Sequence, residues 1–195
     1  IWYLMDMAPL TGGCHYAWDC VGYMKQCGKC YALYSRNSRD MSSKNWSKKY
    51  ACVQKMNITV VACSWLINHA EKASLFKGKR KEKIMLGVDA DIFKPGSGTG
   101  ARQILNLPAN KKVLFVGSLS MRERRKGMRY FLEAVRILEK NEEIDKDNIV
   151  ILTAGDDSVK KTLSDMVFEH VHTGFLDEGG LVNAYQAADV FVCPS

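Results

Sequence analysis

The sequence predicts an α/β fold with parallel sheets in two regions, the first of which carries a cysteine-rich loop insert. In the second region, short runs of Val, Ile and Leu alternate with segments whose apolar residues recur at helical spacing, as in βαβ units. A glycine-rich stretch, residues 87–100, separates this region from an earlier one with strands and helices of its own. Residues 11–34 follow neither periodicity and contain four of the seven cysteines.

Composition limits the classes of partner. The chain has 195 residues, 47% of them hydrophobic, which is enough for a sizeable core in parts of two domains. Its formal net charge is +7, and the basic residues are spread over several loops. Aromatic residues do not interleave with Lys and Arg, so the pattern favours an anionic small ligand or a peripheral membrane surface and indicates no nucleic-acid partner.

Targeting signals are not evident. No apolar run approaches the roughly 20 residues of a transmembrane helix, and no secretion signal is present. An odd number of cysteines without such a signal favours a reduced, cytoplasmic compartment. Because the chain starts within a strand-like segment and stops just after another, we expect it to be a fragment of a larger protein.

The first region should open with a strand over residues 1–5. After the insert we expect a polar, flexible segment over residues 36–44. The remaining elements, in order, are a helix over 46–56, a strand over 58–62, a helix over 65–76 capped by Ser64, a basic turn over 77–83 and a strand over 84–86.

The linker over residues 87–100 contains Pro95 and several glycines. We place the domain boundary inside it, which divides the chain into residues 1–94 and 95–195, and expect the linker to act as a hinge.

The second region should begin with a short helix over residues 102–107, after which strands and helices alternate. The predicted strands and helices are 113–116, 128–139, 148–153, 159–168, 171–173, 181–187 and 190–192. This rhythm predicts a parallel sheet covered on both faces.

A basic loop follows the strand over residues 113–116, which ends at Gly117 and Ser118. Strand, glycine, basic loop and helix is the arrangement of a phosphate site at the carboxyl edge of a parallel sheet. Arg125 and Lys126 are expected in the first helical turn, where the dipole disfavours cations, so an anion is expected beside them. The other interpretation is a solvated loop between a strand and a helix.

Four cysteines of the insert, Cys14, Cys20, Cys27 and Cys30, could close a tetrahedral structural zinc site. Such a site would substitute for the core that this loop does not build. His15 could replace one thiolate as a ligand. The alternative is that these cysteines are reduced or disulfide-paired, without metal.

Two further strand ends are candidate contacts. Asp6 ends the first strand and could orient a sugar hydroxyl, or it could cap nearby backbone. Gly174, Phe175 and Leu176 follow the strand over residues 171–173. Their backbone could contact a nucleobase edge while the Phe175 ring supplies an apolar wall, or they could form a tight turn with a buried Phe175.

Several motifs together resemble glycosyltransferase family 4. They are GVDADIFKP at the linker, KKVLFVGSLS, RKGMRYFLEA, ILTAGDD, GFLD and LVNAYQAADVFVCPS. The front piece, LMDMAPLTGGCHYAWDCVGY followed by CGKC, resembles a bacterial subgroup from exopolysaccharide and surface-polysaccharide assembly.

The resemblance implies the GT-B fold, in which two Rossmann-like domains face each other across a cleft. Residues 1–94 would be the end of the acceptor domain and residues 95–195 the start of the donor domain. The implied activity is transfer of a sugar from a nucleotide-sugar to a saccharide or lipid-linked saccharide, with retention and without a catalytic metal. The protein would be cytoplasmic or peripheral to the membrane.

The resemblance also implies site residues. Lys126 falls at the family's phosphate-binding lysine, and Gly174 to Leu176 fall at its nucleobase loop. The family often has Arg where this chain has Ser118, so Arg124 or Arg125 would supply that charge. A His-Asp pair of the front motif is replaced by Met5 and Asp6. The family's two glutamates after the last motif are absent, so we expect the fragment to be inactive alone.

A second function is compatible with the same residues. The chain could be a zinc-stabilised nucleotide-binding or interaction module without catalysis. A pair of glutamates shortly after the last motif of the parent protein would favour the enzyme.

Overall fold

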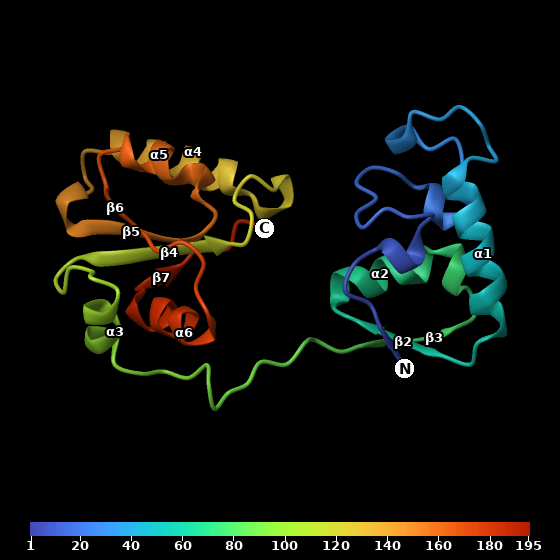
Figure 1. The fold of residues 1–195 in the computed structure, drawn as a ribbon, viewed down its shortest axis with the longest axis horizontal. Coiled ribbons are helices and arrows are strands. Elements are labelled where there is room, and N and C mark those ends of the chain that lie inside the picture. The colour runs from blue at the N-terminus through green and yellow to red at the C-terminus, as the bar shows by residue number, and fades with distance from the viewer. The chain divides into compact units, whose positions relative to one another are not determined.

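The computed structural model describes all residues, 1–195, and they form two compact units, Ile1–Val88 and Asp89–Ser195. The division falls within the glycine-rich linker, a few residues before the predicted position. Each unit contains one sheet of parallel strands with helices packed on it (Figure 1), and the predicted α/β fold class is confirmed. None of the helices combines the length and apolar character needed to cross a membrane.

The first unit has a three-stranded sheet in the order β1–β2–β3. Its strands and α-helices are β1 (Trp2–Tyr3), α1 (Met41–Lys55), β2 (Thr59–Ala62), α2 (Ser64–Lys72) and β3 (Arg80–Lys83). The 3-10 helix Ala8–Leu10 follows β1. The insert consists of turns and the short 3-10 helices Gly22–Met24 and Tyr31–Leu33, and a fourth 3-10 helix, Ser74–Phe76, follows α2. One core joins the sheet, both α-helices and the insert, because Tyr23 of the insert is buried with Trp46 of α1, Val60 of β2 and Leu66 of α2.

The start of α1 differs from the prediction. The helix begins at Met41, within the segment predicted to be polar and flexible. Asp40 precedes it in extended conformation, and its carboxylate accepts the Ser43 N–H at 3.0 Å, which is the bond of a helix N-cap. The predicted start at residue 46 was wrong because the cap, and not the first apolar residue, starts the helix.

The position of β3 is a second correction. The strand is Arg80–Lys83, which was predicted as a basic turn, whereas residues 84–86, predicted as a strand, are exposed. Parallel pairing with β2, in which Thr59 lies opposite Arg80, makes this charged segment a strand. An edge strand needs only one paired side, so its side chains can remain polar.

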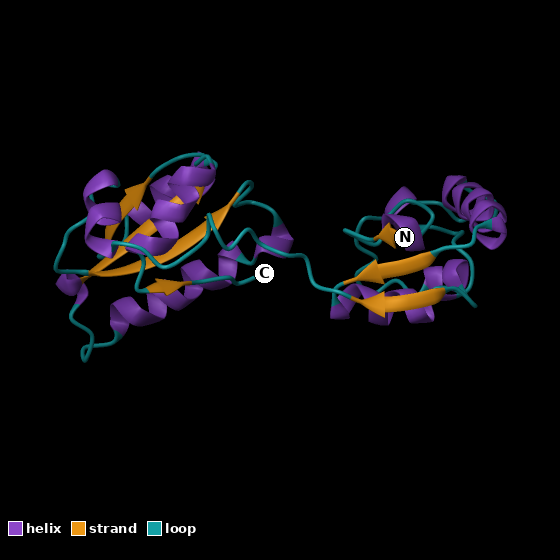
Figure 2. Cartoon of the chain, turned by 90° about the horizontal axis from the view of Figure 1, so that it is seen from below, coloured by secondary structure: helices purple, strands orange, loops and turns teal.

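The second unit has a four-stranded sheet in the order β6–β5–β4–β7. Its elements are α3 (Gly98–Ile104), β4 (Lys112–Ser118), α4 (Met128–Lys140), β5 (Ile149–Gly155), α5 (Lys160–Ser164), β6 (Glu169–His172), α6 (Glu178–Ala187) and β7 (Val190–Phe191), with short 3-10 helices η5 (Arg124–Lys126), η6 (Lys146–Asn148) and η7 (Asp157–Val159). Figures 1 and 2 show helices on both faces of the sheet, with α4 and α5 on one face and α3 and α6 on the other.

Strand alternation builds one core on each face. Phe115 and Leu152 pack in a cluster with residues of α3 and α6, whereas Val116 and Ile151 pack in a second cluster with residues of α4 and α5. Successive side chains of a strand point to opposite faces, so both faces of β4 and β5 are apolar. This explains why these two strands appeared in the sequence as continuous apolar runs.

The strand order places a topological switch point in the second unit. The chain runs from β4 through β5 to β6 on one side, and then crosses through α6 to β7 on the other side of β4. In open parallel sheets, ligands bind outside the carboxyl ends of the strands at such a point. The carboxyl ends of β4 and β7 are therefore the first place to look for a binding site.

Candidate functional site

A pocket of about 190 Å³ lies at the carboxyl ends of the strands in the second unit. It is mainly apolar and is lined by Phe115, Gly117, Ser118 and Leu119 of β4 and its loop, Ala154 and Gly155 of β5, Phe175, Leu176, Leu181 and Tyr185 from the segment around α6, and Phe191 of β7. Four of the predicted donor-site residues, Gly117, Ser118, Phe175 and Leu176, are brought together here.

A close approach of backbones forms the floor of the pocket. Gly155, the last residue of β5, has φ +136°, and a Cβ placed on it would lie 1.8 Å from the Ser118 carbonyl oxygen. No other residue fits between these two strand ends. The Gly155 N–H donates a 2.8 Å hydrogen bond to the Gly174 carbonyl, which holds the loop after β6 against the strand end.

Aromatic side chains from three elements form the wall of the pocket. The Tyr185 ring lies edge-on to Phe115, at 5.4 Å between centroids, and to Phe191, at 5.0 Å. Phe175 lies on the open side and is 66% exposed. Phe115, Tyr185 and Phe191 were not predicted as site residues, and they are up to 76 residues apart in the chain. The only sequence signal was the aromatic content of β4, α6 and β7.

The predicted nucleobase loop divides between two positions. Gly174 has φ +70° and forms a left-handed turn after β6, with nothing within 4 Å of a Cβ placed on it. It does not line the pocket. Leu176 and Phe175 line it. Asp177 then caps α6 by accepting the Gly180 N–H at 2.7 Å. The turn and the apolar wall therefore occur together, but Phe175 is not buried as the alternative interpretation required.

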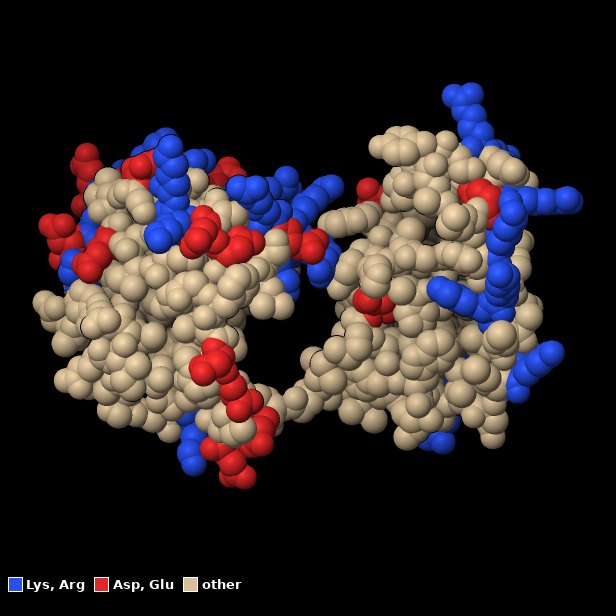
Figure 3. All heavy atoms as spheres, viewed as in Figure 1, with Lys and Arg blue, Asp and Glu red and all other residues tan.

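The basic residues precede α4, so the predicted place of Arg125 and Lys126 in its first helical turn was wrong. Arg124–Lys126 form η5, Gly127 follows in the left-handed region, and α4 begins at Met128 without a side-chain cap. Lys126 makes no hydrogen bond or ion pair through its ammonium group. Figure 3 shows Lys and Arg side chains gathered around this end of the second unit, with acidic side chains among them.

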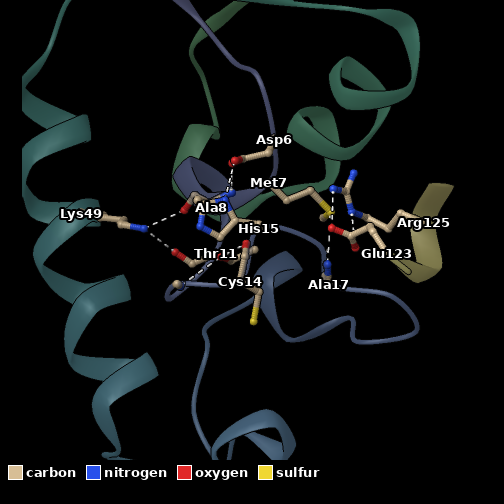
Figure 4. Close-up of polar contacts among 11 residues, drawn as sticks. Asp6, Met7, Ala8, Thr11, Cys14, His15, Ala17, Lys49, Glu123 and Arg125 are labelled. Carbon is tan, nitrogen blue, oxygen red and sulfur yellow. Dashed lines mark hydrogen bonds and ion pairs between the residues drawn. The ribbon is translucent and has the colours of Figure 1, made fainter. Parts of the chain in front are cut away.

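Arg125 has a partner within its own loop. Its Nε and Nη2 each lie 3.1 Å from a carboxylate oxygen of Glu123 (Figure 4), which is the fork geometry of a bidentate ion pair. Arg125 was predicted only as a phosphate ligand. Within this loop Glu123 neutralises Arg125, and the Lys126 ammonium is unpaired.

Asp156, just after β5, links the two loops at this edge. Its carboxylate accepts the Met121 N–H at 3.0 Å and the Ser158 N–H at 2.9 Å. These hydrogen bonds, chiefly those from Ser158, lower the pKa of Asp156. Asp156 therefore holds the loop after β4 at its N-terminal end, while η5 and Gly127 end it at the start of α4.

In the first unit, Asp6 forms a pair with His15. The two side chains lie 2.6 Å apart, Oδ2 to Nδ1, and Asp6 Oδ1 accepts the Ala8 N–H at 2.7 Å (Figure 4). Burial raises the pKa of Asp6, but these hydrogen bonds outweigh it and the pKa is lowered overall. His15 is 72% exposed at its side chain, so the pair presents an imidazole to solvent.

The four cysteines of the insert lie around one further pocket, lined by Cys14, Cys20, Cys27 and Cys30. His15 is not among its lining residues and is turned to Asp6 instead. The structure contains no group of three His, Cys, Asp or Glu side chains already arranged to hold a metal ion.

Comparison with known proteins found a family match for the region that contains the apolar pocket. Residues 110–195 match the profile of the family described as Glycosyl transferases group 1. Among solved structures, the chain is similar to a sucrose-phosphate synthase from Thermosynechococcus elongatus, with a TM-score of 0.55 and 21% sequence identity over 92% of this chain and 43% of that chain. The chain thus spans less than half the length of that structure.

A search of curated proteins found no match. The matched residues 110–195 contain β4 to β7 and every residue that lines the apolar pocket. This region is therefore similar to glycosyl transferases of group 1, and the fold of the chain is similar to that of a sucrose-phosphate synthase.

Proposed function

We propose that this chain is part of a retaining glycosyltransferase that uses a nucleotide-sugar donor and a saccharide or lipid-linked saccharide acceptor in bacterial surface-polysaccharide assembly. The observation that carries the proposal is the apolar pocket at the ends of β4, β5 and β7, which lies inside the residues that match Glycosyl transferases group 1. Retention and the polysaccharide role rest on the motif resemblance, and a cytoplasmic or membrane-peripheral location follows from that role.

The pocket suits the base of the donor. Its volume of about 190 Å³ is smaller than the roughly 300 Å³ or more of a site for a drug-sized ligand, so it takes one ring system and not a whole nucleotide-sugar. Tyr185 and Phe175 supply ring faces against which a planar base can stack. The backbone beside Leu176 would contact the base edge.

The diphosphate would then extend toward the loop that leads from Ser118 to α4. There the Lys126 ammonium and the uncapped start of α4 both attract an anion. Arg125 contributes by exchanging part of its pairing with Glu123 for phosphate oxygens. Arg124 lies in the same 3-10 turn and adds to the local positive charge.

The chemistry follows from where charge develops. Breaking the bond between the anomeric carbon and the diphosphate leaves the electron pair on the phosphate oxygen, and the acceptor oxygen forms the new bond to that carbon. Cations held at the diphosphate stabilise the leaving group in the transition state. Lys126 and Arg125 would do this without a catalytic metal.

The acceptor would be contacted by the first unit through Asp6 and His15. A carboxylate whose pKa is lowered stays an acceptor of hydrogen bonds, and a sugar hydroxyl is a suitable donor. Asp6 also fixes the orientation of the exposed His15 ring, which can accept or donate a hydrogen bond to a second hydroxyl.

The decisive experiment is titration calorimetry of the 195-residue chain with UDP, GDP and ADP. We expect one of them to bind, and Lys126→Ala to weaken that binding about tenfold to a hundredfold, because a charge-assisted hydrogen bond is worth roughly 1.5–3 kcal/mol. Lys140→Ala, which removes an exposed charge at the far end of α4, is the matched control and should bind like wild type.

Glu123→Ala sharpens this test. Removing the anion that occupies the Arg125 fork should raise nucleotide affinity severalfold, whereas a purely structural pair would leave affinity unchanged. If no nucleoside diphosphate binds, or if folded Lys126→Ala binds like wild type, the phosphate assignment is wrong.

The alternative, a nucleotide-binding or interaction module without catalysis, predicts the same binding. The two proposals differ in whether the protein transfers the sugar after the nucleotide-sugar binds. The parent protein, given the nucleotide-sugar of the base that binds, should release nucleoside diphosphate only if it is a transferase. Nucleotide binding with no release in the presence of saccharide acceptors would favour the alternative.

A further inference from the structure

The pocket of the cysteine insert has a volume of about 50 Å³ and brings together four cysteines that are spread over residues 14–30. None of the cysteines forms a disulfide. Cys52 and Cys193 are exposed and lie elsewhere, and Cys63 lies just before α2. The pocket therefore brings together four of the seven cysteines, and the other three lie outside it.

Backbone contacts support the sulfur atoms. The Gly12 N–H donates to Cys27 Sγ at 3.2 Å, and the turn between Cys27 and Cys30 places Lys29 in the left-handed region, with φ +47°. The Cys30 N–H donates to Asp40 Oδ2 at 2.8 Å. An N–H bond to sulfur favours the thiolate, and such outer contacts orient metal ligands.

The insert is attached to α1 by polar contacts at several points. Lys49 Nζ donates to the carbonyls of Ala8, at 2.7 Å, and Thr11, at 3.0 Å (Figure 4), and Asn45 Nδ2 donates to the Gly12 carbonyl at 3.3 Å. These bonds hold the backbone of residues 8–12, of which Thr11 and Gly12 line the pocket. Apart from the 3-10 helices, however, the insert has no regular structure of its own.

We propose that Cys14, Cys20, Cys27 and Cys30 bind one structural zinc ion. Four thiolates close the tetrahedral coordination of zinc and leave no open position, which is the property of a structural site. The side chains do not form a ready ligand set as they lie. Rotation about the single torsion between Cα and Cβ moves a cysteine sulfur by about 3 Å, so rotamer changes can bring the sulfurs that line this pocket closer together.

His15 is not a ligand in this proposal, because its ring nitrogen is held by Asp6. This provides a matched control beside the site. His15→Ala changes the residue next to Cys14 but should keep the metal, whereas Cys14→Ser should lose it.

The test is elemental analysis of the full 195-residue chain, purified under reducing conditions without chelator. We expect one zinc per chain in wild type, Cys52→Ser, Cys193→Ser and His15→Ala, and well under one in the Ser variants of the four pocket cysteines. Replacement by Co²⁺ should give the visible spectrum of tetrahedral thiolate coordination.

Wild-type protein provides a readout even if the Ser variants fail to fold. Titration with a mercurial thiol reagent should release one zinc as the four pocket thiols react, in addition to the reaction of the exposed Cys52 and Cys193. Wild type without stoichiometric zinc, zinc retained after loss of a pocket cysteine, or a disulfide between pocket cysteines in the reduced protein would overturn the proposal. None of these outcomes depends on nucleotide binding, so the glycosyltransferase proposal fails or stands separately.

Discussion

The two pockets are built by different means. The strand-end pocket of the second unit is held by backbone pairing, since β4 pairs with β5 over seven residue positions and with β7 on its other side. The pocket of the first unit is formed by turns, and side chains such as Lys49 and Asp40 hold it to α1. A sheet positions a site through bonds that any sequence can make, whereas a turn-built site depends on particular residues.

Metal removal should give the largest effect and separates the two pockets most clearly. If zinc occupies the cysteine pocket, a chelator should unfold residues 11–34, because structural zinc contributes on the order of 10 kcal/mol. Hydrogen exchange followed by mass spectrometry should show loss of protection in the insert and none in β4 or β5. Equal loss in both units, or in neither, would contradict the comparison.

Gly155→Ala tests the backbone contact in the second unit. The new Cβ would meet the Ser118 carbonyl at 1.8 Å and φ is +136°, so we expect a loss of about 3 kcal/mol or more. Gly174→Ala is the control, since its φ is also positive but nothing lies within 4 Å, and it should cost about 1 kcal/mol. Denaturant unfolding measures both, and equal costs would show that the close approach is not limiting.

Asp189→Ala removes an ion-pair anchor from the sheet-built unit. Asp189 accepts from Arg102 Nη2 at 2.7 Å and from the Val113 N–H at 2.8 Å, and so ties α3 and the start of β7 to β4. We expect a loss of about 2 kcal/mol in denaturant unfolding, with nucleotide affinity kept because the pocket lies at the opposite strand ends. Glu142→Ala, at an exposed position, should be neutral. Loss of the pocket in Asp189→Ala would weaken the view that strand pairing holds it.

Acid should give the smallest effect. Burial, with help from His172 and Lys160, lowers the pKa of His170 to about 4, while the unfolded chain keeps a value of about 6.5. The unfolded state therefore takes up the proton first, so this contribution to stability is complete above pH 6.5 and is lost as pH falls toward 4. His170 and His172 both contact the Thr153 hydroxyl, at 2.8 Å each.

The measurement is unfolding free energy across that pH window. We expect a fall of the order of 1 kcal/mol, after allowance for solvent, that is reduced in His170→Gln. Because burial also lowers the pKa of His69 in the first unit, His69→Gln serves as the comparison. A pH profile unchanged by His170→Gln would show that this residue titrates normally.

Local patterns in the sequence determined much of the second unit. The apolar runs of β4 and β5 and the helical spacing of α4 predicted the strand–helix order, because both faces of these strands are buried. Gly117, Ser118, Phe175 and Leu176 were predicted at the donor site from the strand ends together with the family resemblance. This was possible because the carboxyl ends of parallel strands meet at one edge.

Tertiary structure alone decided the features that depend on partners far away in the chain. β3 is a strand because β2 pairs with it, although its residues are charged, and the wall of Phe115, Tyr185 and Phe191 exists only once α6 and β7 pack beside β4. The sequence also did not reveal that Glu123 occupies the Arg125 fork or that Asp6 holds His15. Periodicity and motifs report which face a residue prefers, whereas the partner of a charged group depends on which side chains the fold brings within about 3 Å of it.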